Sequence, residues 1–274
     1  MSQPNRVAAF FDLDGTLLPP PSLEWRFIRY LLWHGKIGRP NIFRWLGHAG
    51  HSIGGGPRRA IEANKQYLAG LSESLVVDWA NSPKADDVNP ETRGAFAEGL
   101  QRIRWHQSQN HRVFLLTGTL APLANDFATR LPGNVEVIAT DLSDFGTRPR
   151  AIGSAVSDAG KAPYPSIWTG ELASEHMVGA AKCRALRAMA GRHHLDLTGC
   201  YAYGNSIADR AMLEAVGHPA AVNPSRSLAR LARKRCWPVS RWVAAGATHG
   251  KTSERLVIPD AFQNRHQRNS LDHE

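Results

Sequence analysis

Short apolar runs alternate with helical patterns along most of the chain and predict its secondary structure. The run at residues 6–13 (RVAAFFDL) has the length of a buried strand and ends at polar residues. Similar runs follow at residues 112–117, 135–140, 200–205 and 219–223. Helical periodicities lie between them at residues 121–130, 178–191 and 207–216. This alternation predicts βαβ units, and therefore an α/β fold with a doubly wound parallel sheet.

A different pattern separates the first predicted strand from the second. Its apolar positions recur at helical spacing, interrupted by Gly and Pro, without a strand pattern of comparable strength. We therefore predict a helical cap over residues 19–105, inserted into a core formed by residues 1–18 and 106–245. Residues 143–172, rich in Gly, Pro and Ser, fit either a hairpin or a long loop. Residues 246–274 have no periodicity and are predicted to form a weakly ordered tail.

Composition excludes several classes of protein. With 274 residues, 42% of them hydrophobic and 21% charged, the chain has a globular and not a disordered composition. No apolar run reaches the roughly 18 residues of a membrane helix, so we expect a cytoplasmic protein with no membrane span. The three cysteines are widely spaced and predict neither a disulfide framework nor a zinc motif. In the cap, Trp25, Trp33 and Trp45 are expected to be core residues.

The formal charge of +9 is concentrated near the C-terminus. Between Glu214 and Glu254 there are seven Lys and Arg residues and no acidic residue. The helical spacing of Arg226, Arg230 and Arg233 fits an ordinary solvated helix face, which we favour. It also fits a surface that binds nucleic acid or anionic lipid, which we keep as the alternative.

Two carboxylates end the first predicted strand. Asp12 and Asp14 are residues i and i+2 of an extended segment, so their side chains point to the same face. Two carboxylates in one small space need a divalent cation or a shared proton, which indicates metal binding or acid–base chemistry. Gly15 and Thr16 then allow a sharp turn whose N–H groups can face an anion. By itself, the segment from Asp12 to Thr16 also fits a surface turn.

Further polar residues follow other predicted strands or begin helices. Thr117 and Gly118 bring a hydroxyl group and backbone amides to the end of the second strand. Lys182 lies near the start of a helical pattern, where its ammonium can reach a phosphate. Asn205 and Asp209 add oxygen ligands that suit a hard cation. Each residue also fits a cap, a turn or a solvated surface, but their common placement favours one shared site.

With these motifs the chain resembles the haloacid dehalogenase-like hydrolase superfamily and, within it, the phosphoserine phosphatase-like enzymes of subfamily IB. The resemblance is carried by FFDLDGTLL, LLTGT, the lysine of GAAKCRAL and AYGNSIADRAMLEAVGHPAAVNP, which together span residues 10–224. It implies a Rossmann-like core with a helical cap inserted between the first and second motifs. It also implies a Mg²⁺-dependent phosphatase that hydrolyses a small-molecule phosphomonoester through an aspartyl-phosphate.

The resemblance also implies residue roles. Asp12 would be the nucleophile, and Asp14 would be the general acid and later the general base. The residues implied to bind phosphate are Gly15, Thr16, Thr117, Gly118 and Lys182, of which Thr117 and Lys182 also count as catalytic. Those implied to bind Mg²⁺ are Asp12, the backbone carbonyl of Asp14, Asn205 and Asp209. The second aspartate favours a phosphatase over a mutase or a pump, because related phosphotransferases lack an acid there.

Two positions depart from the family pattern. Asn205 stands where the family usually has Asp, which removes one negative charge from the metal site. Pro21 stands nine residues after the nucleophile, where phosphoserine phosphatases place a glutamate that binds the amino group of the substrate; the nearest acid is Glu24. The substrate is therefore left open among small phosphorylated metabolites. Two alternatives to hydrolysis are a weakened relative that binds an anionic partner and a phosphotransferase with an acceptor other than water.

Overall fold

The computed structural model describes residues 6–49, 64–82, 94–145 and 166–244, and these ranges centre on a six-stranded parallel sheet with strand order β3-β2-β1-β6-β7-β8. The strands are β1 (Ala8–Phe11), β2 (Arg112–Leu120), β3 (Glu136–Thr140), β6 (Tyr201–Gly204), β7 (His218–Val222) and β8 (Val239–Ser240). Strand β1 lies between β2, which is the next strand in sequence, and β6, which comes later in the chain. The predicted α/β fold is confirmed, and β1 lies at the point where open sheets of this kind place their sites.

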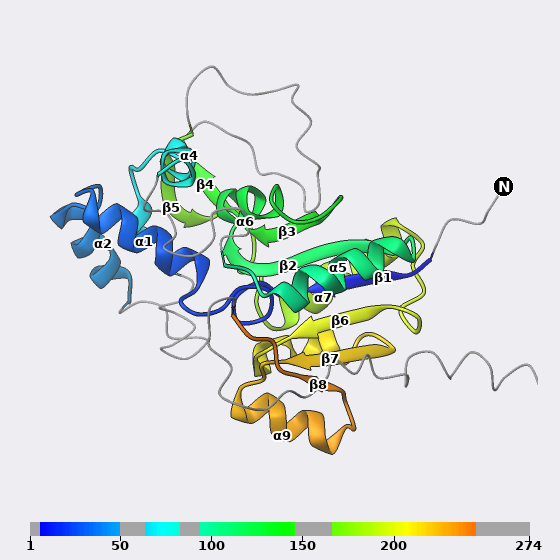
Figure 1. Ribbon diagram of the computed structural model, residues 1–274. Coiled ribbons are helices and arrows are strands. Elements are labelled where there is room, and N and C mark those ends of the chain that lie inside the picture. Colours follow the sequence, from blue (N-terminus) through cyan, green and yellow to red (C-terminus); the bar gives the residue numbers. More distant parts are fainter. Residues whose placement is uncertain (1–5, 50–63, 83–93, 146–165, 245–274) are drawn as a thin grey trace, which may run out of the picture.

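Helices cover both faces of the sheet (Figure 1). On one face, Ala9 and Phe11 of β1 pack in a cluster with residues of α5 (Ala97–Ser108) and α6 (Ala121–Ala128). On the other face, Ala8 and Phe10 pack with α7 (Ala180–Arg192), α8 (Arg210–Leu213) and α9 (Arg226–Lys234). Because all four residues of β1 are fully buried, this strand is a rigid support for the polar residues that follow it.

Six further elements lie at the carboxyl ends of the strands (Figure 1). They are α1 (Leu23–Trp33), α2 (Arg39–Ala49), the short 3₁₀ helix η2 (Gln66–Leu68), α4 (Ser74–Ala80), β4 (Leu142–Asp144) and β5 (Trp168–Leu172). Strands β4 and β5 pair antiparallel, so the region that fitted a hairpin or a loop contains two paired strands. Gly70 donates its N–H to the Trp168 carbonyl at 2.8 Å, which ties η2 to β5.

Helix α5 packs against β2, although most of its residues fall within the range predicted for the cap. His106 near its C-terminal end is fully buried and lies 2.8 Å from the Tyr203 hydroxyl group of β6 through Nε2. Its Nδ1 lies 2.9 Å from Nδ1 of His111. These contacts join α5 to the sheet, and the division of the chain into core and cap otherwise stays a prediction. The predicted C-terminal tail lies outside the described residues.

Two local predictions were wrong. Trp25 and Trp33 are 51% and 77% exposed, because the buried stripe of α1 consists of Leu23, Phe27 and Leu31 at helical spacing. Only Trp45 packs partly against the core. The helix expected over residues 207–216 is instead a 3₁₀ turn, η3 (Ile207–Asp209), followed by the single turn of α8.

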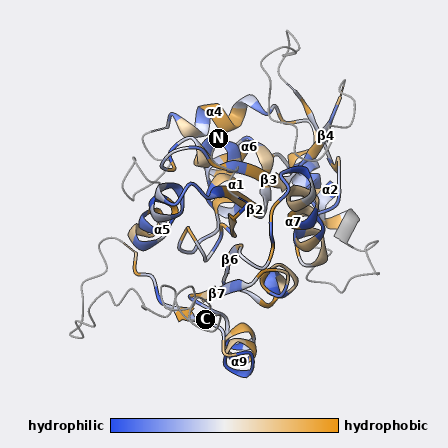
Figure 2. Ribbon diagram, turned by 90° about the vertical axis from the view of Figure 1, so that its right-hand side faces the viewer, coloured by the Kyte–Doolittle hydropathy of each residue, from blue (hydrophilic) through white to orange (hydrophobic). Residues whose placement is uncertain are grey.

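Helix α9 contains four of the seven Lys and Arg residues between Glu214 and Glu254 and has the pattern of a solvated helix. Leu228 and Ala232 are buried while its arginines are exposed, and Figure 2 shows polar and apolar residues on different sides of the helix. Beyond its end, Arg235 pairs with Glu214 at 3.0 Å. The alternative of an anionic partner is therefore not favoured. Within the described ranges, each helix is too short or too polar to cross a membrane.

Candidate active site

Asp12 directly follows β1 and is still held by the sheet, since its N–H donates to the Tyr203 carbonyl at 3.0 Å. The residue is only 6% exposed. Its Oδ1 accepts a hydrogen bond from Lys182 Nζ at 2.5 Å, and its Oδ2 accepts one from Thr16 Oγ1 at 2.9 Å. A buried carboxylate with a donor on each oxygen has a fixed orientation at the edge of the sheet.

Lys182 joins Asp12 to the turn after β6. It lies in the first turn of α7, and its Nζ also donates to Asp209 Oδ1 at 2.7 Å. The other oxygen of Asp209, Oδ2, accepts from the N–H of Asn205 at 3.2 Å and from the N–H and hydroxyl of Ser206 at 3.0 and 3.1 Å. Asp209 therefore positions both Lys182 and the turn that carries Asn205.

The charges in this group are not balanced. Burial raises the pKa of Asp12 to about 7, the negative charge of Asp209 adds to the increase, and Lys182 opposes it. Burial alone would lower the pKa of Lys182, but the two carboxylates raise it, so the ammonium stays charged. With Asp14 beside them, three carboxyl groups share one ammonium. A further cation would stabilise the ionised form of Asp12.

Asp14 is oriented by two hydrogen bonds from different parts of the chain. Its Oδ1 accepts from the N–H of Leu23, at the start of α1, at 2.8 Å. Its Oδ2 accepts from Thr119 Oγ1, near the end of β2, at 2.6 Å. Burial raises the pKa of Asp14, while the hydrogen bond from Thr119 lowers it. A carboxyl group with a raised pKa holds a proton closer to neutral pH, as general acid–base catalysis requires.

Glycines allow the motif segments to approach one another. Gly15 has φ +85°, and a Cβ there would lie 1.8 Å from Nδ2 of Asn205. A Cβ on Gly118 would lie 2.8 Å from Cγ2 of Val178, in the segment before α7. Both positions therefore need glycine, because a side chain would displace the neighbouring motif.

The structure brings the predicted residues to one edge of the sheet. Thr117 is 1% exposed, and its Oγ1 accepts from the N–H of Thr119 at 3.1 Å, which leaves its hydroxyl hydrogen available to a ligand. The predicted residues that gather here are Asp12, Asp14, Gly15, Thr16, Thr117, Gly118, Lys182, Asn205 and Asp209.

The sequence did not assign two features of this region. The first is the hydrogen bond from the Thr119 hydroxyl group to Asp14. The sequence could have indicated it, because residues two apart in a strand, such as Thr117 and Thr119, point to the same face. The second is a cluster of Glu24, Lys65 and Tyr67 in the region predicted to form the cap, whose members are up to 43 residues apart. No local sequence pattern signals such a contact.

The oxygen atoms around Asp12 suit a hard divalent cation. Within the described part of the chain, no three His, Cys, Asp or Glu side chains form a group that could hold a metal. Here Lys182 lies between Asp12 and Asp209, so a cation site at Asp12 would draw on the amide oxygen of Asn205 and a backbone carbonyl. Such a set of carboxylate, amide and carbonyl oxygens is typical of Mg²⁺ or Ca²⁺ sites and not of zinc sites.

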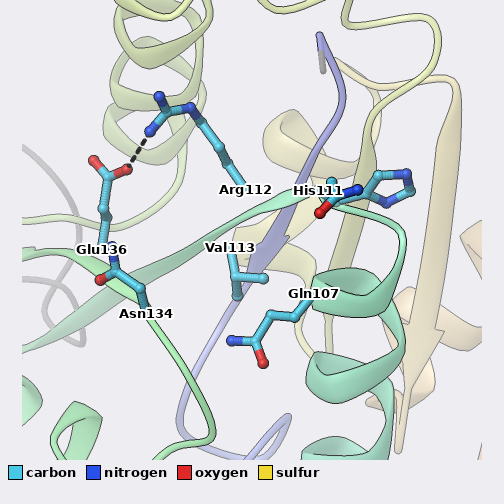
Figure 3. Close-up of a pocket in the computed structure, with 7 residues that line it drawn as sticks. Gln107, His111, Arg112, Val113, Asn134 and Glu136 are labelled. Carbon is cyan, nitrogen blue, oxygen red and sulfur yellow. Dashed lines mark hydrogen bonds and ion pairs between the residues drawn. The ribbon is translucent and has the colours of Figure 1, made fainter. Parts of the chain in front are cut away.

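A cavity of about 230 Å³ lies elsewhere, at the beginning of β2 (Figure 3). It is lined in part by Arg112, which pairs with Glu136 at 3.1 Å. Thr117 is five residues further along the strand, roughly 16 Å away at about 3.3 Å per residue. This cavity is therefore separate from the carboxylate site.

Comparison with known proteins identifies the family of this chain. The family model described as haloacid dehalogenase-like hydrolase matches residues 9–214. The chain belongs to this family. The resemblance noted from the motifs is thus confirmed, and the chain is a hydrolase of this family.

Curated relatives align over most of the chain. "Inhibition of morphological differentiation protein" from Streptomyces azureus is 29% identical over 236 residues, which are 85% of this chain and 78% of the relative. "Probable phosphatase Rv3661" from Mycobacterium tuberculosis is 29% identical and is aligned over 85% of this chain and 75% of its own length. "Phosphoserine phosphatase SerB1" from the same species is 27% identical over 93% of this chain and 76% of its own length.

Solved structures support the fold. A protein of unknown function from Bordetella pertussis Tohama I has a TM-score of 0.65 at 24% identity, covering 86% of this chain and 98% of that one. A phosphoserine phosphatase solved as a phospho-aspartyl intermediate analogue has a TM-score of 0.52 at 16% identity, covering 86% and 93% of the two chains. The family of hydrolases and the α/β architecture are therefore established for this chain.

Proposed function

We propose that this hydrolase is a Mg²⁺-dependent phosphatase that hydrolyses a small phosphomonoester through an aspartyl-phosphate on Asp12, and that it acts in the cytoplasm. The main observation behind the proposal is that two carboxyl groups lie at one site and are bound by different hydrogen-bond partners. Asp12 is bound by Lys182 and Thr16, whereas Asp14 is bound by Thr119 and the start of the cap. The names of two curated relatives as phosphatases support the same activity.

In this mechanism Asp12 attacks the phosphorus atom with a carboxylate oxygen. Lys182 is 2.5 Å from Asp12 Oδ1 and offsets negative charge as the phosphate approaches. The hydroxyl of Thr117 and the N–H of Gly118 hold phosphate oxygens at the end of β2. These groups are fixed before the substrate arrives, so little reorganisation is needed during phosphoryl transfer.

Asp14 transfers protons in both steps. It first gives its proton to the leaving oxygen, and the phosphoryl group then remains on Asp12. Asp14 next takes a proton from the water that attacks the aspartyl-phosphate, which releases inorganic phosphate and restores Asp12. The two hydrogen bonds from Leu23 and Thr119 keep its carboxyl group in one orientation during these transfers.

Mg²⁺ would be held by Asp12, the backbone carbonyl of Asp14 and Asn205, with Asp209 beside them. The excess of carboxylates around Lys182 fits this cation. When bound, Mg²⁺ supplies positive charge that favours the ionised nucleophile and the incoming phosphate. The amide of Asn205 contributes an oxygen without a charge, so we expect weaker Mg²⁺ binding than with Asp at that position.

The direct test is phosphate release from a generic aryl phosphate with and without Mg²⁺. We expect activity that requires Mg²⁺ and is abolished by Asp12→Asn, which keeps the shape of the side chain but removes the nucleophilic charge. Asp196→Asn is the matched control, since Asp196 is exposed in a loop where it bonds Thr198. Absence of activity in the wild-type enzyme, or undiminished activity in Asp12→Asn, would refute the proposal.

A further inference from the structure

A cluster in the cap joins Glu24, Lys65 and Tyr67. Lys65 Nζ and the Tyr67 hydroxyl group both donate to Oε1 of Glu24, each at 2.5 Å. The side chains of Lys65 and Glu24 are 5% and 16% exposed, and Tyr67 is 9% exposed. The ammonium and the carboxylate therefore form a neutral pair that is largely removed from solvent, in contrast to an exposed surface ion pair.

This cluster lies beside Asp14. Glu24 follows Leu23, whose N–H binds Asp14 Oδ1 at 2.8 Å. The charge of Glu24 is close enough to contribute to the raised pKa of Asp14, after the larger effect of burial. If Asp14 protonates the leaving oxygen, the rest of the leaving group extends toward the cap residues nearest Asp14. The first turn of α1 meets Asp14 through Leu23, and its Glu24 side chain contacts Lys65 and Tyr67.

The cluster is held in place by its surroundings. A Cβ on Gly170 would lie 3.0 Å from Cα of Gln66 and 3.1 Å from Cβ of Ala69, so β5 packs directly against η2. Asn64 binds the Trp45 carbonyl of α2 at 2.8 Å and the N–H of Gln66 at 3.1 Å. Contacts on both sides of Lys65 thus fix its backbone, and the pair with Glu24 is formed before a substrate binds.

We propose that Glu24, Lys65 and Tyr67 form the surface that receives the leaving group, and that they select phosphomonoesters with a hydroxyl-bearing, uncharged leaving group over those with an amine. This inference rests on the proposed phosphatase function and adds the class of substrate to it.

The chemistry of the pair explains this selection. An unpaired carboxylate at Glu24 would attract an ammonium group, but its charge is already offset by Lys65, and its Oε1 already accepts two hydrogen bonds. Because the pair carries no net charge, it offers neither an ammonium nor a carboxylate an unopposed opposite charge, and such a charged group would lose its hydration without a partner. A hydroxyl group can accept from Lys65 and donate to Glu24 without disturbing the pair.

Three phosphomonoesters of two carbons test this: 2-hydroxyethyl phosphate, phosphoethanolamine and phosphoglycolate. They differ in one terminal group, which is a hydroxyl, an amine or a carboxylate. We expect wild-type kcat/KM to be highest for the hydroxyl ester at pH 8 with Mg²⁺. Lys65→Met, which leaves Glu24 unpaired, should raise the amine-to-hydroxyl ratio at least about tenfold. Glu24→Gln, which leaves Lys65 unpaired, should raise the carboxylate-to-hydroxyl ratio by a similar factor.

A control at a distant site separates selection from general damage. Arg112→Met breaks the ion pair with Glu136 at the separate cavity and should change none of the ratios. If one charge variant does not fold, the opposite shift expected of the other still tests the inference.

Preference of the wild type for phosphoethanolamine, or equal loss on all three esters in both charge variants, overturns the inference. Hydrolysis of an aryl phosphate that depends on Asp12, together with unchanged ratios in Lys65→Met and Glu24→Gln, overturns the substrate class alone. No hydrolysis of the aryl phosphate or of the three esters overturns the proposed function and this inference together.

Discussion

Replacing Lys182 with Met tests whether this ammonium balances the buried carboxylates. The substitution keeps most of the side-chain volume but removes the donor to Asp12 at 2.5 Å and to Asp209 at 2.7 Å. The side chains of Asp12 and Asp209 are 9% and 1% exposed, so water replaces the lost partner poorly. Removing one partner of a buried charge pair costs about 3–5 kcal/mol, and we expect a loss of this size in the free energy of unfolding at pH 8.

The loss should depend on pH in a defined direction. Lys182 lowers the pKa of Asp12 against the opposing effect of burial, so the variant has a still higher pKa than the wild-type value of about 7. A carboxyl group whose folded pKa is raised stabilises the fold while protonated, and that contribution is lost as pH rises through the folded pKa. Between pH 8 and pH 6 the carboxyl group of Asp12 is protonated to a larger extent in the variant than in the wild type. The difference in the free energy of unfolding between the two proteins should therefore be about 1 kcal/mol smaller at pH 6 than at pH 8.

Urea denaturation of both proteins at pH 6 and pH 8, with a chelator present, measures these differences. Arg112→Met is the control: its exposed pair with Glu136 should contribute no more than about 1 kcal/mol. The double variant Lys182→Met/Asp209→Asn removes one of the unpaired charges and should recover part of the stability but no activity. A loss below about 1 kcal/mol at pH 8, or a larger loss at pH 6 than at pH 8, would refute the charge balance described here.

Two further predictions concern Asp14 and the interior of the sheet. Thr119→Val removes the 2.6 Å hydrogen bond to Asp14. It should lower kcat/KM for an aryl phosphate about 10- to 100-fold, since a hydrogen bond to a charged group contributes about 1.5–3 kcal/mol. Thr129→Val, on the surface, should have no effect, and equal activity in both variants would contradict the positioning role of Thr119. Burial lowers the pKa of His106 from 6.5 to about 2, and the charge of His111 adds to this decrease. Because the folded state resists protonation of His106, stability is lost as pH falls below 6.5. The free energy of unfolding should therefore fall by about 2 kcal/mol between pH 7 and pH 5 through this group, and His106→Gln should reduce that dependence; an unchanged pH dependence would contradict it.

The strands and the motif residues could be predicted because their signals are local. Strand β1 is apolar throughout and stops at Asp12, as expected for a strand buried on both faces. Gly15 also has a local cause, since its φ of +85° is a backbone conformation that favours glycine. The parallel sheet then brings residues as far apart as Asp12 and Lys182 to one edge, which a βαβ reading anticipates.

The region between β1 and β2 was harder to predict, because its contacts join segments distant in sequence. The aromatic residues Trp25 and Trp33 fit a core by composition, yet the rotation of α1 about its axis places them outside. Helix α5 continues the helical pattern of the cap but packs on β2, because its buried face matches the sheet. Periodicity shows that a helix has an apolar face and does not show which neighbour covers it.

The sequence by itself determined the fold class and the identity of the residues at the carboxylate site, since strand burial and turn chemistry are properties of short segments. Only the tertiary structure decided how these residues are paired: Lys182 between two carboxylates, Asp14 between α1 and β2, and Glu24 with Lys65. Hydrogen bonds and charge balance depend on distances between segments that the chain brings together only when it folds, and on how far burial excludes water from them.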